Sequence, residues 1–128
     1  MAQTVKIVAG IIADHRPIVR ARIKRGKLEF SERGDLEFVV DTGFTGDILF
    51  PAELTEKLDL KFVSYDSFQL AADQTIALPV YRGQIMLARA MLEVEMMPGD
   101  ALIGMSLLQA IGSRLILDFD RARFELRA

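Results

Sequence analysis

An apolar segment that ends abruptly in a carboxylate constrains this chain more than any other feature. Residues 38–51 read FVVDTGFTGDILFP, so a hydrophobic strand signal runs directly into Asp41, Thr42 and Gly43 and resumes at Ile48. Asp, Thr and Gly all suit turns, and a turn in an unrelated β-rich domain is the simplest interpretation. The alternative is that Asp41 is held there for acid–base chemistry, because a carboxylate at the end of a buried strand needs hydrogen-bond donors.

The composition is that of an ordinary globular domain. The chain has 128 residues, 51% of them hydrophobic, which is enough for a core without disulfides, and we expect a single domain over residues 1–128. Lys and Arg number 16 against 18 Asp and Glu and form no basic block, so nucleic acid is not an expected partner. The apolar residues 7–13 are too few for a membrane span. We therefore expect no membrane partner and a cytoplasmic location.

The side-chain inventory excludes several kinds of catalysis. The chain has no Cys and one histidine, so a Cys–His nucleophile or a His-rich zinc site cannot be built within one chain. That histidine, His15, lies in the polar segment 14–17, which is typical of an exposed turn. Asp118 and Asp120 could bind a divalent cation, although Asp at a hairpin turn is the commoner case. We expect no metal and no cofactor.

The hydrophobic periodicity is mostly that of β-strands. It predicts strands over residues 5–12, 18–24, 27–30, 36–40, 47–50, 115–119 and 123–126, with more between 62 and 92. Breaks are expected at 72–74, the tip of a long hairpin, and at 82–83. Two short helices are predicted, one starting at Pro51 and one over 105–111 that ends at Gly112. The order of strands, glycine-bearing loop and short helix thus occurs twice.

A lone carboxylate is a poor catalyst of amide hydrolysis, because the leaving amine must also receive a proton. Two neighbouring carboxyls that share one proton solve this problem, since one acts as base and the other as acid. Asp-Thr-Gly occurs only once in the chain, so the second carboxylate would come from another copy across a two-fold axis. Asp41 would then meet Asp41 of its partner, and the site would exist only in a homodimer.

Two motifs make the chain resemble the single-domain retropepsin-like aspartic proteases of the pepsin clan, particularly their small bacterial and archaeal forms. The first motif is the apolar lead-in 38–40 followed by Asp41-Thr42-Gly43. The second is Leu102-Ile103-Gly104, followed by the helix over 105–111. By the order of its elements, the resemblance covers residues 36–119.

This resemblance implies a mainly β fold, a closed β-barrel lobe with two short helices that acts as a homodimer on a peptide or protein substrate. Asp41 would be the catalytic carboxylate, Thr42 would brace the two catalytic loops across the dimer axis, and Gly43 would contact the dyad through its backbone. A ψ-shaped strand crossing would support the site, and the residues expected to form it are Leu102, Ile103 and Gly104.

The resemblance also implies a flap, a hairpin over residues 70–76 that closes over substrate. The residues expected to form the flap or contact substrate are Phe44, Ala71, Ala72, Asp73 and Gln74. Retropepsins have a small residue after the Asp-Thr-Gly triplet and a glycine-rich flap, and this chain departs from both patterns. These departures favour an alternative function, a catalytically weak or inactive peptide-binding or dimerisation module on the same fold.

Three further expectations concern the surface. Tyr65 and Tyr81 are interpreted as half-buried strand residues, although each could lie near the flap. The alternation of Glu93 and Glu95 with apolar neighbours indicates a solvated strand face. The terminal strands, near Val5 and near Phe124, are the candidate dimer edges.

Overall fold

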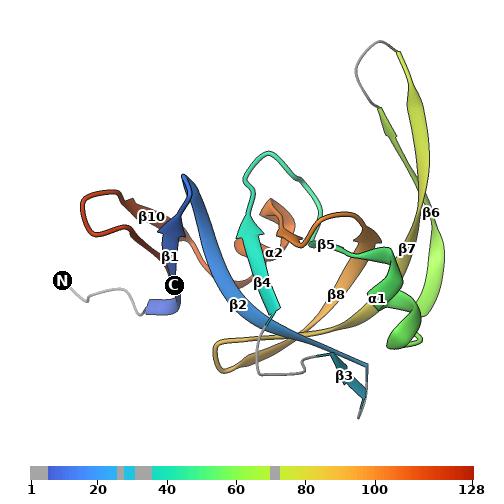
Figure 1. The fold of residues 1–128 in the computed structure, drawn as a ribbon, viewed down its shortest axis with the longest axis horizontal. Coiled ribbons are helices and arrows are strands. Elements are labelled where there is room, and N and C mark those ends of the chain that lie inside the picture. Colours follow the sequence, from blue (N-terminus) through green and yellow to red (C-terminus); the bar gives the residue numbers. More distant parts are fainter. Residues whose placement is uncertain (1–5, 26–27, 31–35, 70–72) are drawn as a thin grey trace.

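The computed structural model describes residues 6–25, 28–30, 36–69 and 73–128, and within them the chain is mainly β with two short helices (Figure 1). The elements are β1 (Lys6–Ala13), β2 (Arg16–Arg25), β3 (Leu28–Phe30), β4 (Leu36–Val40), β5 (Ile48–Phe50), α1 (Ala52–Lys57), β6 (Lys61–Gln69), β7 (Thr75–Leu87), β8 (Ala90–Pro98), β9 (Leu102–Ile103), α2 (Met105–Ile111), β10 (Arg114–Asp118) and β11 (Arg123–Arg127). The helix predicted over 105–111 is confirmed with its end at Gly112, while Pro51 caps α1 from just outside it.

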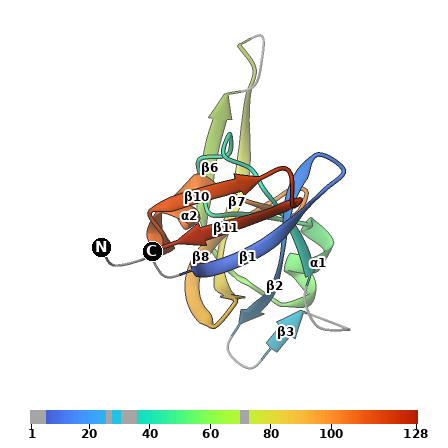
Figure 2. The same ribbon diagram turned by 90° about the vertical axis from the view of Figure 1, so that its left-hand side faces the viewer.

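Six strands close into a barrel. In hydrogen-bonding order they are β2, β4, β9, β5, β8 and β7, and an additional pairing between β2 and β7 completes the ring. The ladder continues outward from β2 through β1 and β11 to β10, and outward from β7 to β6. Figure 2 shows the first of these extensions, with β10, β11 and β1 side by side. The expected closed β-barrel lobe is therefore confirmed.

The barrel interior follows from strict alternation along the strands. In β2, Val19, Ala21 and Ile23 are buried, whereas the basic side chains between them lie on the other face. Phe38 of β4 and Phe50 of β5 are fully buried and stack with ring centroids 6.4 Å apart. Burying such a side chain contributes about 1.5–3 kcal/mol, so this aromatic pair is a large part of the force that holds β4 and β5 on one core.

The break predicted at residues 82–83 is wrong, because β7 runs through Gly83 without interruption. Gly83 is buried, and a Cβ placed there would lie 2.4 Å from the Met96 side chain and 3.2 Å from the carbonyl oxygen of Lys24. The glycine allows neighbouring groups to approach closely and does not mark a turn. The chain reverses later, at Ala88 and Arg89, between the paired residues Leu87 and Ala90.

The hairpin of β6 and β7 extends beyond the barrel, as Figure 1 shows at its upper right. Tyr65 is 70% exposed, so its predicted half-burial is wrong, whereas Tyr81 is half-buried as expected. The reason is that β6 lies outside the core: every residue of the strand except Phe68 is exposed, and the Tyr65 ring contacts the Phe62 ring edge to face, with centroids 5.1 Å apart. At the hairpin end Asp73 and Gln74 are exposed, while Ala71 and Ala72 lie outside the described residues.

The remaining local expectations concern turns and edges. His15 is exposed in the hairpin between β1 and β2 and has φ 63°, with φ 53° at Asp14, as in a type I′ turn. Asp118 accepts a hydrogen bond from the Arg121 backbone N–H at 3.1 Å, which is a hairpin-turn role. Glu93 and Glu95 are exposed as predicted. Within the described segments, no group of three or more His, Cys, Asp or Glu residues could hold a metal ion, and no helix is long and apolar enough to cross a membrane.

The strand that carries Phe124 is not an edge of the sheet within one chain, and its part in a dimer stays a prediction. Phe124 is 1% exposed, because β11 lies between β10 and β1 and both of its edges are paired. Val5 lies outside the described residues, and the strand that follows it, β1, is also paired on both sides. Among the described strands, the ladder therefore ends at β10 on one side and at β6 on the other.

Candidate active site

Strand β4 delivers Asp41 to the rim of the barrel. Phe38 and Val40 point into the core, so the alternation places Asp41 on the opposite side of the strand, where it is half-buried. The backbone N–H of Asp41 donates to the Ile103 carbonyl at 2.9 Å, which extends the β4–β9 ladder by one residue. The backbone that carries this carboxylate is therefore fixed by the sheet.

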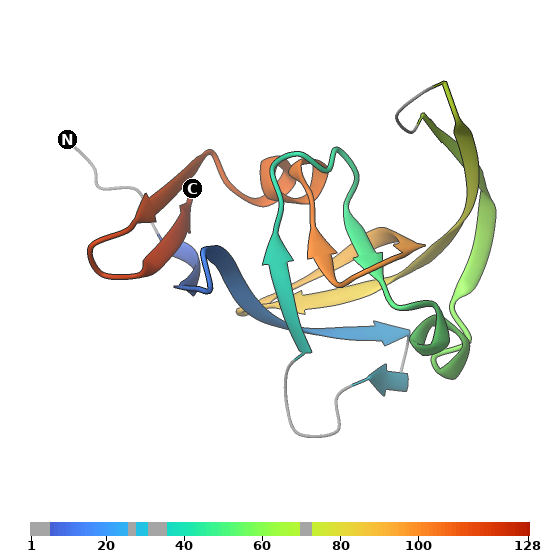
Figure 3. The same ribbon diagram turned by 45° about the horizontal axis from the view of Figure 1, so that its top comes forward.

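Strand β9 lies between β4 and β5, the strands on either side of the Asp-Thr-Gly loop. Its Ile103 pairs in parallel with Val40 and antiparallel with Ile48. Figure 3 shows this crossing, with β9 in orange between β4 in teal and β5 in green. The structure thus brings Leu102, Ile103 and Gly104 beside Asp41, although about sixty residues separate the two motifs in the chain.

The loop supplies a hydrogen-bond donor to its own carboxylate. The Gly43 N–H donates to Asp41 Oδ1 at 2.8 Å, and the Phe44 N–H donates to the Asp41 carbonyl at 3.2 Å. A Cβ on residue 43 would lie 3.2 Å from Asp41 Oδ1, tighter than an ordinary contact. A glycine at this position therefore lets the amide approach the carboxylate without a side chain between them.

Three backbone hydrogen bonds tie the rest of the loop to the start of α2. The N–H groups of residues 104, 105 and 106 donate to the carbonyls of Asp47, Phe44 and Gly46 at 2.9, 2.8 and 3.2 Å. A Cβ on Gly104 would lie 2.2 Å from the Gly46 carbonyl oxygen and 2.6 Å from the Phe44 ring. Phe44, which the sequence suggests as a substrate contact, thus packs against Gly46 and Gly104; its contact with substrate stays a prediction.

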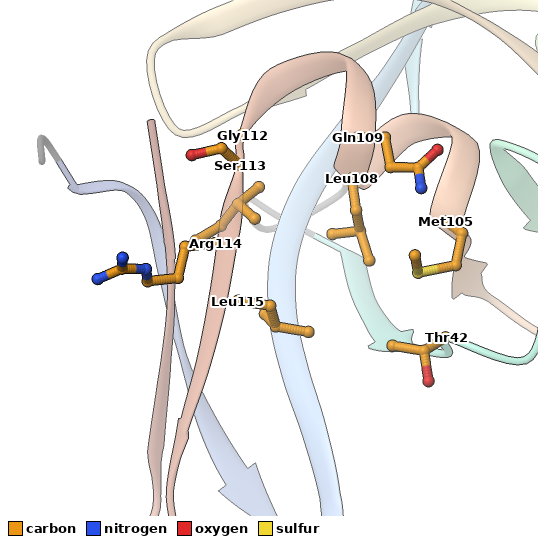
Figure 4. A pocket seen from close by; sticks show the side chains of 9 residues that line it. Thr42, Met105, Leu108, Gln109, Gly112, Ser113, Arg114 and Leu115 are labelled. Carbon is orange, nitrogen blue, oxygen red and sulfur yellow. The ribbon is translucent and has the colours of Figure 1, made fainter.

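A hollow of about 370 Å³ lies on the Thr42 side of the loop. Leu108 and Gln109 of α2, Arg114 and Leu115 of β10, and Thr42 line it. Figure 4 shows Thr42 on one side and Leu115 on the other, with the Arg114 side chain pointing away. Thr42 is exposed, as a residue that braces a second copy would need to be.

A second hollow, of about 260 Å³, lies on the other side of the loop, between it and the β6–β7 hairpin. Thr45, Gly46 and Asp47 face Asp66 and Phe68 of β6 across it. The sequence reasoning missed these residues as candidates for the site. The signal was present, because alternation in β6 places Asp66 and Phe68 on one face of a strand that leads into the expected flap.

Asp47 has a structural role that its position in the sequence does not reveal. Its Oδ2 accepts a hydrogen bond from the Glu95 N–H of β8 at 3.0 Å, and its carbonyl accepts from Gly104. Asp73 and Gln74 lie at the far end of the hairpin, so the structure does not bring them to the loop that carries Asp41.

The comparisons with known proteins bear on the fold. The sequence matches no protein-family model and no curated protein. Among solved structures, the fold is similar to that of EIAV protease in complex with the inhibitor HBY-793, with a TM-score of 0.57 and 14% sequence identity over 81% of this chain and 95% of that chain.

The chain therefore has a retropepsin-like fold, the fold of the retroviral aspartic protease that it matches. It carries an Asp-Thr-Gly loop at the strand crossing of that fold. At this low identity the similarity concerns the fold alone.

Proposed function

We propose that this protein is an aspartic endopeptidase whose active site forms from two copies of the chain. The observation that carries the proposal is the position of Asp41, half-buried at the crossing of β4, β9 and β5, with its Oδ1 hydrogen-bonded to the Gly43 amide. A two-fold axis beside this loop would bring Asp41 to Asp41 of the partner subunit. The pair of carboxyls would hold one proton between them.

In the proposed mechanism, the ionised Asp41 takes a proton from a water molecule, and the water oxygen attacks the peptide carbonyl carbon. The protonated Asp41 of the partner subunit transfers its proton to the carbonyl oxygen, which gives a tetrahedral gem-diol and leaves that carboxyl ionised. The first Asp41 then gives the proton that it took from water to the amine nitrogen, and one gem-diol hydroxyl returns a proton to Asp41 of the partner subunit. The C–N bond breaks, a carboxylic acid and an amine leave, and the dyad is again singly protonated. Each copy supplies one of the two carboxyls, so neither copy works alone.

We propose that the hollow between the loop and β6 is one half of a substrate groove, and that the second copy supplies the other half. Its position beside Thr45 and Asp47 suits an extended peptide that runs past the Asp41 loop, and the β6–β7 hairpin would cover it as the flap. The particular resemblance to the bacterial and archaeal forms and the cytoplasmic location remain predictions, since the fold similarity addresses neither.

The first test is Asp41→Asn. Asparagine has the size of aspartate and keeps an oxygen that can accept from Gly43, so we expect the chain to fold and dimerise normally and to lose peptide cleavage by about a thousandfold or more. Cleavage of a mixture of unstructured peptides, followed by mass spectrometry, measures it. The matched control is Asp14→Asn, an exposed turn aspartate with φ 53° that asparagine also tolerates.

The same experiment distinguishes the proposed protease from the alternative function, a peptide-binding module. Peptide cleavage by Asp41→Asn equal to that of the parent protein would remove Asp41 from catalysis and with it the proposal. If the parent protein binds peptides without cleaving them, and the variant binds equally well, the chain is instead a peptide-binding module on this fold.

A further inference from the structure

The hollow between the Asp41 loop and β6 has carboxylates on each of its walls. Asp47 belongs to the loop, Asp66 to β6 and Glu95 to β8, and the described residues that line the hollow include no Lys, Arg or His. No described cation forms an ion pair with these acids. Arg82, which faces Glu95 in the β7–β8 ladder, lines a different hollow. The described part of the chain therefore leaves this negative charge without a partner of opposite sign.

Apolar side chains form the rest of the same hollow. Val80 of β7 is 4% exposed and Met97 of β8 is 6% exposed, while Phe68 of β6 is half-buried. Asp66 and Glu95 are exposed, so the hollow combines a buried apolar surface with carboxylates that water reaches. Lys and Arg side chains suit such a surface, because they bury an apolar stem and keep the charged end in water. The volume of about 260 Å³ has room for one long side chain.

We propose that this hollow selects substrates with a Lys or Arg side chain near the scissile bond, and that Asp66 and Glu95 determine the preference. The inference rests on the proposed function, because it assigns a substrate class to the groove proposed there. A carboxylate attracts a cation more strongly beside apolar surface than in bulk water, since the effective dielectric constant is lower. Asp47 adds negative charge, but its side chain also accepts from the Glu95 N–H and so supports the loop.

The symmetry of the proposed enzyme gives the substrate two such hollows. An axis that passes between Asp41 and Asp41 of the partner subunit places one copy of the hollow on each side of the scissile bond. An extended peptide therefore meets negative charge before the bond and again after it. A cation on either side should favour cleavage, and cations on both sides should favour it more.

Peptides that differ at one position measure this preference. Lys, norleucine or Glu is placed in turn at each position on either side of the cleaved bond of an otherwise neutral peptide. Norleucine keeps the apolar stem of lysine without its ammonium group, so the comparison isolates the charge. At one position on each side, kcat/KM should be about tenfold higher for the Lys peptide than for the norleucine peptide, and lowest for the Glu peptide. The preference should fall as salt is added, because salt screens the attraction.

Substitutions of Asp66 test the residue itself. Asparagine keeps an oxygen that can accept from the Ser67 N–H, so Asp66→Asn removes charge with little change of shape. It should lower the ratio of Lys-peptide to norleucine-peptide cleavage by about threefold, and Asp66→Lys should shift the preference toward the Glu peptide. Glu93→Lys is the matched control for charge reversal, an exposed residue of β8 that does not line the hollow, and it should keep the parent ratio. Circular dichroism and thermal unfolding check that each variant folds.

The outcomes separate this inference from the proposed function. Cleavage that depends on Asp41 but is equal for the Lys and norleucine peptides at every position would overturn the preference and leave the protease proposal standing. A preference that persists unchanged in Asp66→Lys would overturn the assignment of Asp66. If the parent protein cleaves no peptide, the protease proposal fails, and fluorescence anisotropy of the same peptides decides the preference. Tighter binding of the Lys peptide that Asp66→Lys abolishes would then support it, whereas equal binding or no binding would overturn it.

Discussion

At the scale of single residues, the two glycines near Asp41 have different physical reasons to be there. Gly43 presents its N–H to the Asp41 carboxylate, and a side chain there would crowd that oxygen. Gly104 lies where the Asp-Thr-Gly loop meets α2, and a Cβ there would meet two backbone oxygens. Glycine is therefore needed at position 104 for packing, so a substitution there should affect folding before it affects catalysis.

Gly104→Ala should lower the free energy of unfolding by about 2–3 kcal/mol, because the new methyl group would overlap the Gly46 and Phe44 carbonyl oxygens, which are backbone atoms with little freedom to move. Urea denaturation followed by circular dichroism measures it. Gly99→Ala is the control, since its Cβ would meet only the Leu49 side chain, at 3.1 Å, and should cost less than about 1 kcal/mol. Equal losses in the two variants would contradict this account of Gly104.

The residues of the site differ in how far the sequence could reveal them. Asp41, Thr42 and Gly43 stand out because a carboxylate ends an apolar strand, and that signal is local. The packing of Phe44 against Gly104 depends on a contact between segments sixty residues apart in the chain, which no local pattern reports. For the same reason the sequence does not reveal the role of Asp47, whose side chain accepts from Glu95.

At the scale of elements, the strands and helices were largely predictable, and the clearest error came from a glycine. Glycine in an alternating strand signals either a turn or a close approach, and the pattern around Gly83 does not distinguish the two. In the structure, the side chain of Met96 on the neighbouring strand β8 lies against Gly83, so this glycine marks a close approach and not a turn. The true turn at Ala88 has no glycine at all, so composition could not mark it.

The backbone conformation of the turn between β7 and β8 predicts how a substitution at Ala88 changes stability. Ala88, the first central residue of this turn, has φ 55°, a backbone conformation that favours glycine. Ala88→Gly should raise the free energy of unfolding by about 0.5–1 kcal/mol, because the left-handed conformation strains a side-chain-bearing residue. Thermal or urea unfolding measures the change.

The control for this change is Ala77→Gly, the same substitution at an exposed residue inside β7. It should lower the free energy of unfolding by about 0.5–1 kcal/mol, because glycine loses more backbone freedom on folding. A loss of stability in Ala88→Gly as large as that in Ala77→Gly would show that the turn stores no such strain.

At the scale of the whole molecule, the barrel carries two extensions, the β6–β7 hairpin from β7 and the β1–β11–β10 sheet from β2. Figure 1 shows them at opposite ends, with the Asp41 loop between β4 and β5. In the proposed enzyme, the β6–β7 hairpin would cover substrate, and a second copy would complete the active site. Function then belongs to the assembly and not to the chain.

An active site that needs one Asp41 from each copy predicts that an inactive copy lowers the activity of the parent chains it pairs with. If Asp41→Asn chains are added in equal amount to parent chains and allowed to exchange, the activity per parent chain should fall to about one half, since half of the parent chains then sit in dimers with one carboxylate. A fluorogenic peptide assay measures it, with Asp14→Asn as the added chain for comparison. Unchanged activity per parent chain after full exchange would show that a single copy suffices for catalysis.

The insertion of β9 between β4 and β5 has a consequence for synthesis of the protein. The Asp41 backbone is held by Ile103, so during translation the loop stays without its support until the chain has grown past that residue. Such distant pairing also forms slowly, because a long stretch of chain must be ordered first. If the proposed function is right, the nascent polypeptide would be unable to cleave peptide bonds at the ribosome before Ile103 has been synthesised.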